Sequence, residues 1–200
     1  SRVHLSHAGH ALVGDQTYGG RRKVAPKVMG ESLAAELNNR FPGVGPFWFN
    51  GTKTDHKGLP RRKLDRTPDH GLPERRPCEE HAKGSFTCWQ MGGAGAVGGQ
   101  VMTGMATLAK LRAAFPDEVR VWPFQMLKRP VSLVEIWPSL IAPAVAAAAD
   151  PIKDRAQVRL LARALSRLAA DELQRMLAVD EPEEGWILGV GHEQILLDAL

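Results

Sequence analysis

Two acidic residues in the C-terminal half of the chain, Glu135 and Asp154, have apolar neighbours and could act as buried carboxylates. Glu135 interrupts an otherwise apolar run, VSLVEIWPSLI at residues 131–141. A buried carboxylate without a partner costs several kcal/mol, so a sequence keeps one where a cation, a metal or a hydrogen-bond donor compensates it. Asp154 precedes Val158 by four residues and Leu161 by seven, which places all three on one face of a helix. The spacing predicts that both carboxylates point inward.

Acids that come from a strand and from the following helix can meet at one end of a sheet, where paired carboxylates commonly hold divalent cations. Glu135 and Asp154 are therefore predicted as metal ligands and catalytic residues, with Mg²⁺ or Mn²⁺ as the cofactor. A structural alternative stays open. Asp154 would then complement the helix N-terminus, and Glu135 would pair with a basic residue, for which the candidates are Arg120, Lys128, Arg129 and Arg155.

A glycine-rich stretch at residues 93–98, GAGAVG, matches the G-x-G-x-x-G pattern of dinucleotide-binding loops through Gly93, Gly95 and Gly98. The acid that should close the next strand is missing, because VRVWPFQ at residues 119–125 ends in Gln. We therefore favour a tight turn that either contacts a phosphate through its amides or packs closely against the protein.

A basic loop is predicted at residues 57–77, where proline, glycine and cations replace large apolar residues. Residues 1–90 hold 15 Lys and Arg against 9 Asp and Glu, whereas residues 91–200 hold 11 against 13. The loop is either a solvated surface or an arm that contacts nucleic acid. The candidate contacts are Arg61, Arg62, Lys63, Arg66, Arg75 and Arg76.

The elements that would position these groups alternate between helix and strand, which is typical of an α/β sheet. Helices are expected at 31–41, 100–115 and 150–178, and strands at 85–91, 119–124 and 131–137. In the last helix Asp150 is the expected cap, and Val158, Leu161, Leu165, Leu168 and Leu177 form the expected core stripe.

Length and composition suit one soluble domain with ordinary charge content. Cys78 and Cys88 give no disulfide framework, and no apolar run reaches the length of a membrane span, so a cytoplasmic protein is expected. His4, His7 and His10 recur every third residue but lack further ligands at metal-binding spacing.

Residues 2–20, RVHLSHAGHALVGDQTYGG, resemble the C-terminal part of the RluA-type pseudouridine synthases. That family places its catalytic Asp in an upstream H-R-L-D motif, which this chain lacks. The resemblance implies that these residues are a fragment of an RNA-modifying enzyme, and it identifies no catalytic residue in this sequence.

A second resemblance covers residues from about 32 to 190 through LAAELNNRFPGVGPFWFN, GLPERRPCEEHAKGSFTCWQMGGAGAVGGQ, VEIWPSL, KDRAQVRLLARAL and EEGWILGV. These segments are similar to an uncharacterised bacterial family, sometimes labelled as cobalamin or molybdopterin-guanine-dinucleotide biosynthesis proteins, which resembles predicted nucleases with an RNase H-like fold. The resemblance implies that Glu135 and Asp154 are two acids of such a site. It also implies that the acid of the first strand is missing.

The expected fold class is α/β, with a partial RNase H-like sheet flanked by helices and an irregular basic N-terminal half. Three regions are expected: a pseudouridine-synthase-like remnant at 1–30, a helix and basic loop at 31–84, and an α/β core at 85–200. The expected parent activity is metal-dependent phosphodiester hydrolysis, weak or absent here because the acid of the first strand is missing; the two resemblances together suggest a chimera, a misassembled reading frame or a fused remnant. An RNA pseudouridine synthase fragment and a non-catalytic module that binds nucleic acid or nucleotides are the alternatives.

Overall fold

The computed structural model of the chain describes residues 26–49, 55–63, 70–93, 95–96, 98–181 and 183–200. The RluA-like stretch, its three histidines and Arg66 lie outside the described residues. The structure is mixed α/β, with helices and a small parallel sheet. It divides into two compact units, which we describe separately: unit 1 holds residues 1–79 and 84–117, and unit 2 holds residues 80–83 and 118–200.

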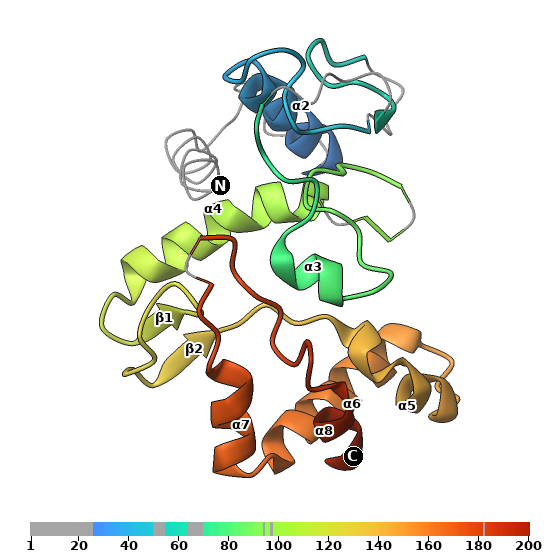
Figure 1. The fold of residues 1–200 in the computed structure, drawn as a ribbon, viewed down its shortest axis with the longest axis vertical. Helices are drawn as coiled ribbons and strands as arrows, with labels where there is room; N and C mark the ends of the chain where they lie inside the picture. Colours follow the sequence, from blue (N-terminus) through green and yellow to red (C-terminus); the bar gives the residue numbers. More distant parts are fainter. Residues whose placement is uncertain (1–25, 50–54, 64–69, 94, 97, 182) are drawn as a thin grey trace. The chain divides into compact units, whose positions relative to one another are not determined.

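Unit 1 is organised around two helices, α2 (Pro26–Asn38) and α4 (Gly98–Ala114), which pack against each other (Figure 1). A Cβ atom added at Gly30 would lie 3.0 Å from the carbonyl oxygen of Gly99, so the two backbones come together at a pair of glycines. The core of this unit consists of Leu33, Ala34, Ala35, Leu37, Phe47, Leu59, Trp89, Met91 and Met102.

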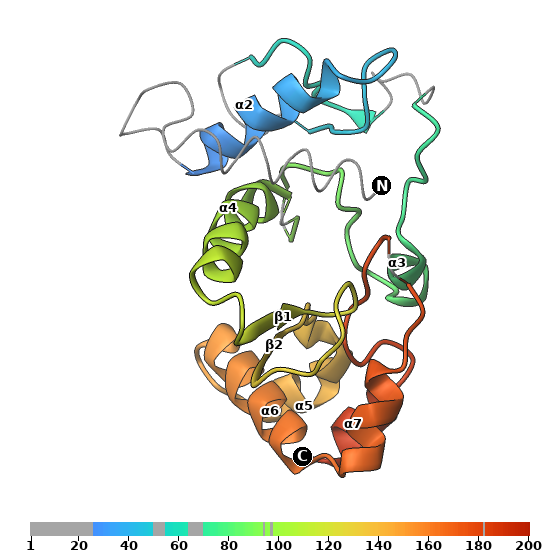
Figure 2. The same cartoon turned by 90° about the vertical axis from the view of Figure 1, so that its left-hand side faces the viewer.

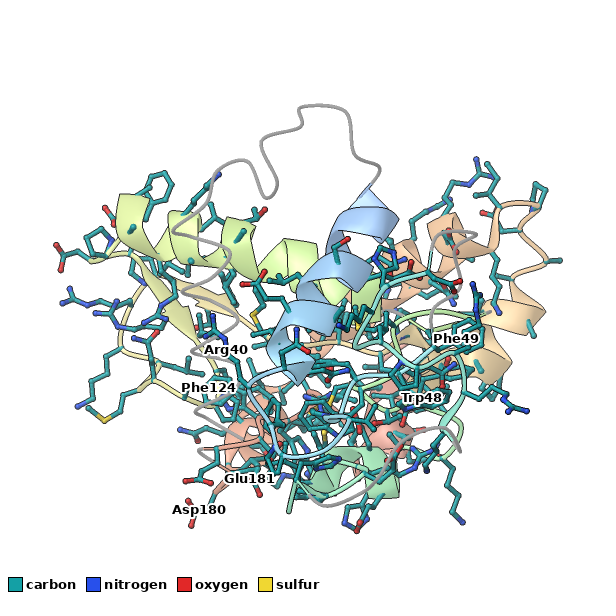
Figure 3. All side chains as sticks on the ribbon, turned by 90° about the horizontal axis from the view of Figure 1, so that it is seen from above. Arg40, Trp48, Phe49, Phe124, Asp180 and Glu181 are labelled. Carbon is teal, nitrogen blue, oxygen red and sulfur yellow. The ribbon has the colours of Figure 1, made fainter. Side chains whose placement is uncertain are left out.

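Irregular segments make up most of the rest of unit 1. The strand expected at residues 85–91 is wrong, because this segment contains a turn and a single bridge between Gln90 and Trp48. Its side chains bond to the basic loop instead of extending a sheet: Trp89 Nε1 donates to Pro73 O at 2.9 Å, and Thr87 Oγ1 donates to Glu74 O at 2.5 Å. The Trp48 ring meets the Phe49 ring edge-on at 6.2 Å (Figure 3).

Unit 2 contains the sheet, in which β1 (Val119–Val121) and β2 (Val131–Leu133) run parallel with Val119 opposite Val131. Figure 2 shows these strands side by side. Both expected strands are confirmed in type and are shorter than expected. The outer edge of β1 is capped by a side chain, because the Val121 amide donates to Gln125 Oε1 at 3.0 Å. This contact limits the addition of a further strand at that edge.

The other regular elements of unit 2 are helices (Figure 1). They are η3 (Pro138–Ile141), α5 (Ala142–Ala147), α6 (Lys153–Arg167), α7 (Ala170–Leu177) and α8 (Glu193–Asp198). η3, α5, α6 and α8 contact one another around a core that includes Ile141, Leu161 and Leu196. The short helix α3 (Pro77–His81) crosses the boundary between the units.

The single helix expected at 150–178 is wrong, since two helices occupy that range. Leu168 and Ala169 adopt ψ angles of 136° and 152°, which end α6, and the Ala169 amide then donates to Glu172 Oε2 at 2.9 Å at the start of α7.

The division between units also differs from the expected boundary at residue 85. Residues 84–117 belong to unit 1, in which α4 packs on α2. None of the helices in the described part of the chain is long and apolar enough to cross a membrane.

Candidate functional site

The carboxylate of Glu135 is exposed, contrary to the expectation of an inward-pointing acid. β2 ends at Leu133, so Glu135 lies beyond the strand, where it forms an isolated backbone bridge with Ile187. Its carbonyl oxygen accepts from the Leu188 amide at 2.9 Å. The neighbouring Ile136 side chain is 48% exposed, so the apolar sequence around Glu135 does not mark a buried strand.

Asp154 is also exposed, which corrects the second half of the prediction. The helical spacing is right, because Asp154 and Leu161 do lie on similar sides of α6. The packed part of α6 begins only at Ala156, however, and every residue from 151 to 155 is exposed. Val158, expected in the core stripe, is 68% exposed, and the buried residues of the helix are Ala156, Leu161 and Ala164.

Glu135 and Asp154 therefore do not form the enclosed, water-poor pair of carboxylates that the sequence predicted. Among the residues that the structure describes, no group of three or more His, Cys, Asp or Glu side chains is placed to hold a metal ion. Binding of Mg²⁺ or Mn²⁺ by Glu135 and Asp154 stays a prediction, without the burial that motivated it.

The glycine-rich turn supports the close-packing alternative. A Cβ atom at Gly98 would lie 2.3 Å from the carbonyl oxygen of Gln90, and one at Gly95 would lie 2.7 Å from the Phe86 ring. At Gly93 the neighbour would be Gln90 Nε2, at 3.0 Å. Protein atoms thus occupy the space beside these glycines, and a positive φ at Gly93 and Gly95 gives a second reason for the residue type. Contact with a phosphate at this turn is not needed to explain them.

The cations of the basic loop are largely engaged within unit 1. Arg61 pairs with Asp55 at 2.5 Å, and Lys63 pairs with Glu74 at 3.2 Å. Other bonds involve Arg75, whose guanidinium donates to Ser85 O at 3.1 Å, and Arg76, which pairs with the buried Glu79 at 2.9 Å. Arg62 is exposed.

A different cationic surface lies on α6, where Arg155, Arg159, Arg163 and Arg167 recur every fourth residue and are all exposed. Arg155 is held by Asp150 through bonds of 2.9 and 2.8 Å, and this contact lowers the pKa of the Asp150 carboxyl and raises that of the guanidinium. Arg167 donates to Leu200 O at 2.8 Å. The side chains of Arg159 and Arg163 make no ion pair or hydrogen bond with any described residue.

A second cluster, in unit 1, was not singled out by the sequence analysis. Glu31 on α2 is completely buried, and its Oε2 lies 3.7 Å from Nε2 of His56. The other ring nitrogen, Nδ1, lies 3.3 Å from Oγ of the half-buried Ser32. A buried acid that needs a compensating partner therefore does exist in this chain, at Glu31 instead of Glu135.

The signal for Glu31 was present in its helix, since ESLAAEL places Glu31 four residues before Ala35 on an apolar face. Its partner comes from a loop more than twenty residues away, which periodicity does not reveal. Comparison of the chain with protein-family models, with curated proteins and with solved structures finds no match. The RluA-like and RNase H-like resemblances accordingly stay predictions, and the arginine face of α6 and the Glu31 cluster are the candidate sites.

Proposed function

We propose that this protein binds nucleic acid without sequence specificity, through the α6 arginine face formed by Arg155, Arg159, Arg163 and Arg167. The observation that carries the proposal is the state of Arg159 and Arg163, which are exposed and whose side chains form no ion pair or hydrogen bond with a described residue. A free guanidinium can bond to a phosphate without first breaking a contact within the protein.

The spacing of the arginines suits a polyanion. Four residues of α-helix rise roughly 6 Å, and each strand of duplex DNA carries one charge per about 3.4 Å of duplex axis, so successive arginines can reach separate phosphates of one strand. No acid occurs from residue 155 to residue 170, and repulsion of phosphates is therefore small along this face.

The α6 face is favoured over the basic loop because four of the loop cations, Arg61, Lys63, Arg75 and Arg76, already bond to other groups of unit 1. Asp150 bonds to the first arginine of this face, and the rest of unit 2 is acidic overall. Residues 80–83 and 118–200 together hold 10 Lys and Arg against 13 Asp and Glu, a net charge of −3. A unit that is acidic overall but has four arginines in one row would orient an approaching polyanion toward that row.

The fold and the parent activity are not needed for this proposal. A two-stranded parallel sheet with helices is compatible with part of an RNase H-like sheet, and that assignment stays a prediction. Metal-dependent hydrolysis also stays a prediction, as does a pseudouridine-synthase origin of residues 2–20.

The test is fluorescence anisotropy of the full chain with labelled single- and double-stranded oligonucleotides of mixed sequence, measured over a salt series. We expect binding that weakens steeply with salt, and a double variant, Arg159→Ala with Arg163→Ala, that lowers the slope of log K against log salt by about 2. The affinity at low salt should fall by about tenfold or more.

The matched control removes two exposed cations from α4, Lys110→Ala with Arg112→Ala, and so changes the net charge equally. This control should retain most of the affinity. Equal losses in both double variants would show that net charge alone governs binding, and binding that does not respond to salt would contradict a phosphate contact.

A further inference from the structure

The cluster of Ser32, His56 and Glu31 combines a hydroxyl, an imidazole and a carboxylate in one chain of contacts. Ser32 Oγ lies 3.3 Å from His56 Nδ1, and His56 Nε2 lies 3.7 Å from Glu31 Oε2. The His56 side chain is 9% exposed and that of Glu31 is 0% exposed. We propose that this cluster is a nucleophilic site in which Ser32 attacks small acyl esters, an activity separate from the binding proposed for α6.

The order of the three groups is the one that nucleophilic catalysis requires. A serine hydroxyl is a weak nucleophile until a neighbouring base accepts its proton, and the base works best when a third group fixes its tautomer and orientation. The carboxylate on the Nε2 side favours a proton on Nε2. Nδ1 is then left as the acceptor that faces Ser32.

The surrounding structure holds the base in place from both sides. Glu31 and Ser32 are consecutive on α2, so their side chains diverge by about 100° around the helix axis, and the His56 ring contacts both of them. The loop that carries His56 is fixed to the end of α2 as well, because Asn38 Nδ2 donates to Gly58 O at 2.8 Å. This bond restricts movement of His56 relative to Ser32.

The proposed reaction is balanced without a cofactor. Ser32 Oγ forms a bond to the carbonyl carbon of the ester while its proton moves to His56 Nδ1, and the leaving alkoxide departs with that proton as an alcohol. Water then attacks the acyl-serine, gives its proton to Nδ1, and releases the carboxylic acid as the serine regains its proton. The imidazolium formed in each half is stabilised by the buried carboxylate of Glu31.

The exposure of the cluster limits the substrate. Glu31 is enclosed, whereas Ser32 and His56 are partly exposed, so a ligand would meet the cluster from the side of these two residues. A small, activated acyl group fits this access better than a polymer does.

The test is labelling of the full chain with an alkyl fluorophosphonate, which transfers phosphorus to a nucleophilic serine and releases fluoride, followed by peptide mass spectrometry. We expect modification at Ser32 that Ser32→Ala abolishes. Ser85→Ala is the matched control, because Ser85 is also half-buried but its hydroxyl donates to the carbonyl oxygen of Glu79 at 3.4 Å and does not contact a histidine. In this variant, Ser32 should be labelled at the rate of the unaltered protein.

His56→Ala should slow labelling about 100-fold, as expected for loss of a general base, and added imidazole should restore part of the rate. A purely structural histidine would show no such rescue. An unlabelled Ser32 in protein that has the circular dichroism of the folded chain would overturn the proposal, as would a His56→Ala variant that labels at the unaltered rate.

Discussion

The two units of this chain differ in whether their polar and charged side chains are buried. The buried polar and charged side chains among the described residues, Glu31, Asn38, Glu79 and Thr87, all belong to unit 1. In unit 2 the buried side chains are apolar, and the charged ones, including the α6 arginines, lie at or near the surface. A buried ionisable cluster is suited to chemistry, whereas a row of exposed cations is suited to binding a charged surface.

The difference follows from how each unit satisfies its backbone. Unit 1 has long irregular segments, whose amides and carbonyls need partners that a sheet would otherwise supply. Buried side chains fill that role: Asn38 bonds to the backbone of Phe47 and Gly58, and Arg76 and Glu79 bond to each other beside the Arg76 amide. Unit 2 satisfies much of its backbone within helices, so its core needs only apolar contacts.

The largest effect that would test this contrast is expected at Asn38. Its amide makes bonds of 2.8 Å to Phe47 O, 2.8 Å to Gly58 O and 2.9 Å from the Phe47 amide, and the residue is 1% exposed. Asn38→Ala leaves these buried groups without partners, so we expect a loss of about 4 kcal/mol in the free energy of unfolding of unit 1. Hydrogen exchange resolved by peptide measures the two units separately.

The exposed neighbour Asn39 provides the control for this experiment. Asn39→Ala should change stability by less than about 0.5 kcal/mol. If the amides of unit 1 exchange as slowly in the Asn38→Ala variant as in the unaltered chain, the buried side chains do not hold the loops of this unit in place.

A smaller effect is expected from apolar truncation in unit 2. Leu161 is 4% exposed on the packed side of α6, so Leu161→Ala should lower the unfolding free energy of unit 2 by about 3 kcal/mol. Val158 is 68% exposed one turn earlier, and Val158→Ala should cost less than about 0.5 kcal/mol. Urea denaturation followed by helical circular dichroism compares the two. Similar costs would restore the originally expected core stripe, and with it an inward Asp154.

The smallest effect is an acid dependence at the start of α6. The hydrogen bonds from Arg155 and from the Ile152 amide lower the pKa of Asp150 below its ordinary value of 3.8. Because the folded-state pKa is the lower one, the contribution of Asp150 is fully present above pH 3.8 and is lost as the pH falls through the lowered pKa. Asp150→Asn should remove this part of the acid dependence. A carboxyl NMR titration with the Asp150 pKa at or above its ordinary value would contradict the contact.

Much of the local structure could be predicted from the sequence. The apolar spacing along α4 predicted that helix to within two residues at each end, and strand-like runs located β1 and β2. The predictions failed where a segment's state depended on a distant partner. Residues 85–91 have strand-forming composition but bond mainly to loops, and the helix expected at 150–178 breaks at Leu168, where no glycine or proline signals an end.

The sequence by itself located the helical segments of α2, α4 and α6 and placed four arginines on one face of α6, because both depend on spacing within a few residues. Only the tertiary structure decided which carboxylates are buried. Glu135 and Asp154 have apolar neighbours in sequence but are exposed, whereas Glu31 is enclosed and meets His56 from a separate loop. Burial is set by what the rest of the chain packs over a residue, and that information is not carried by its immediate neighbours.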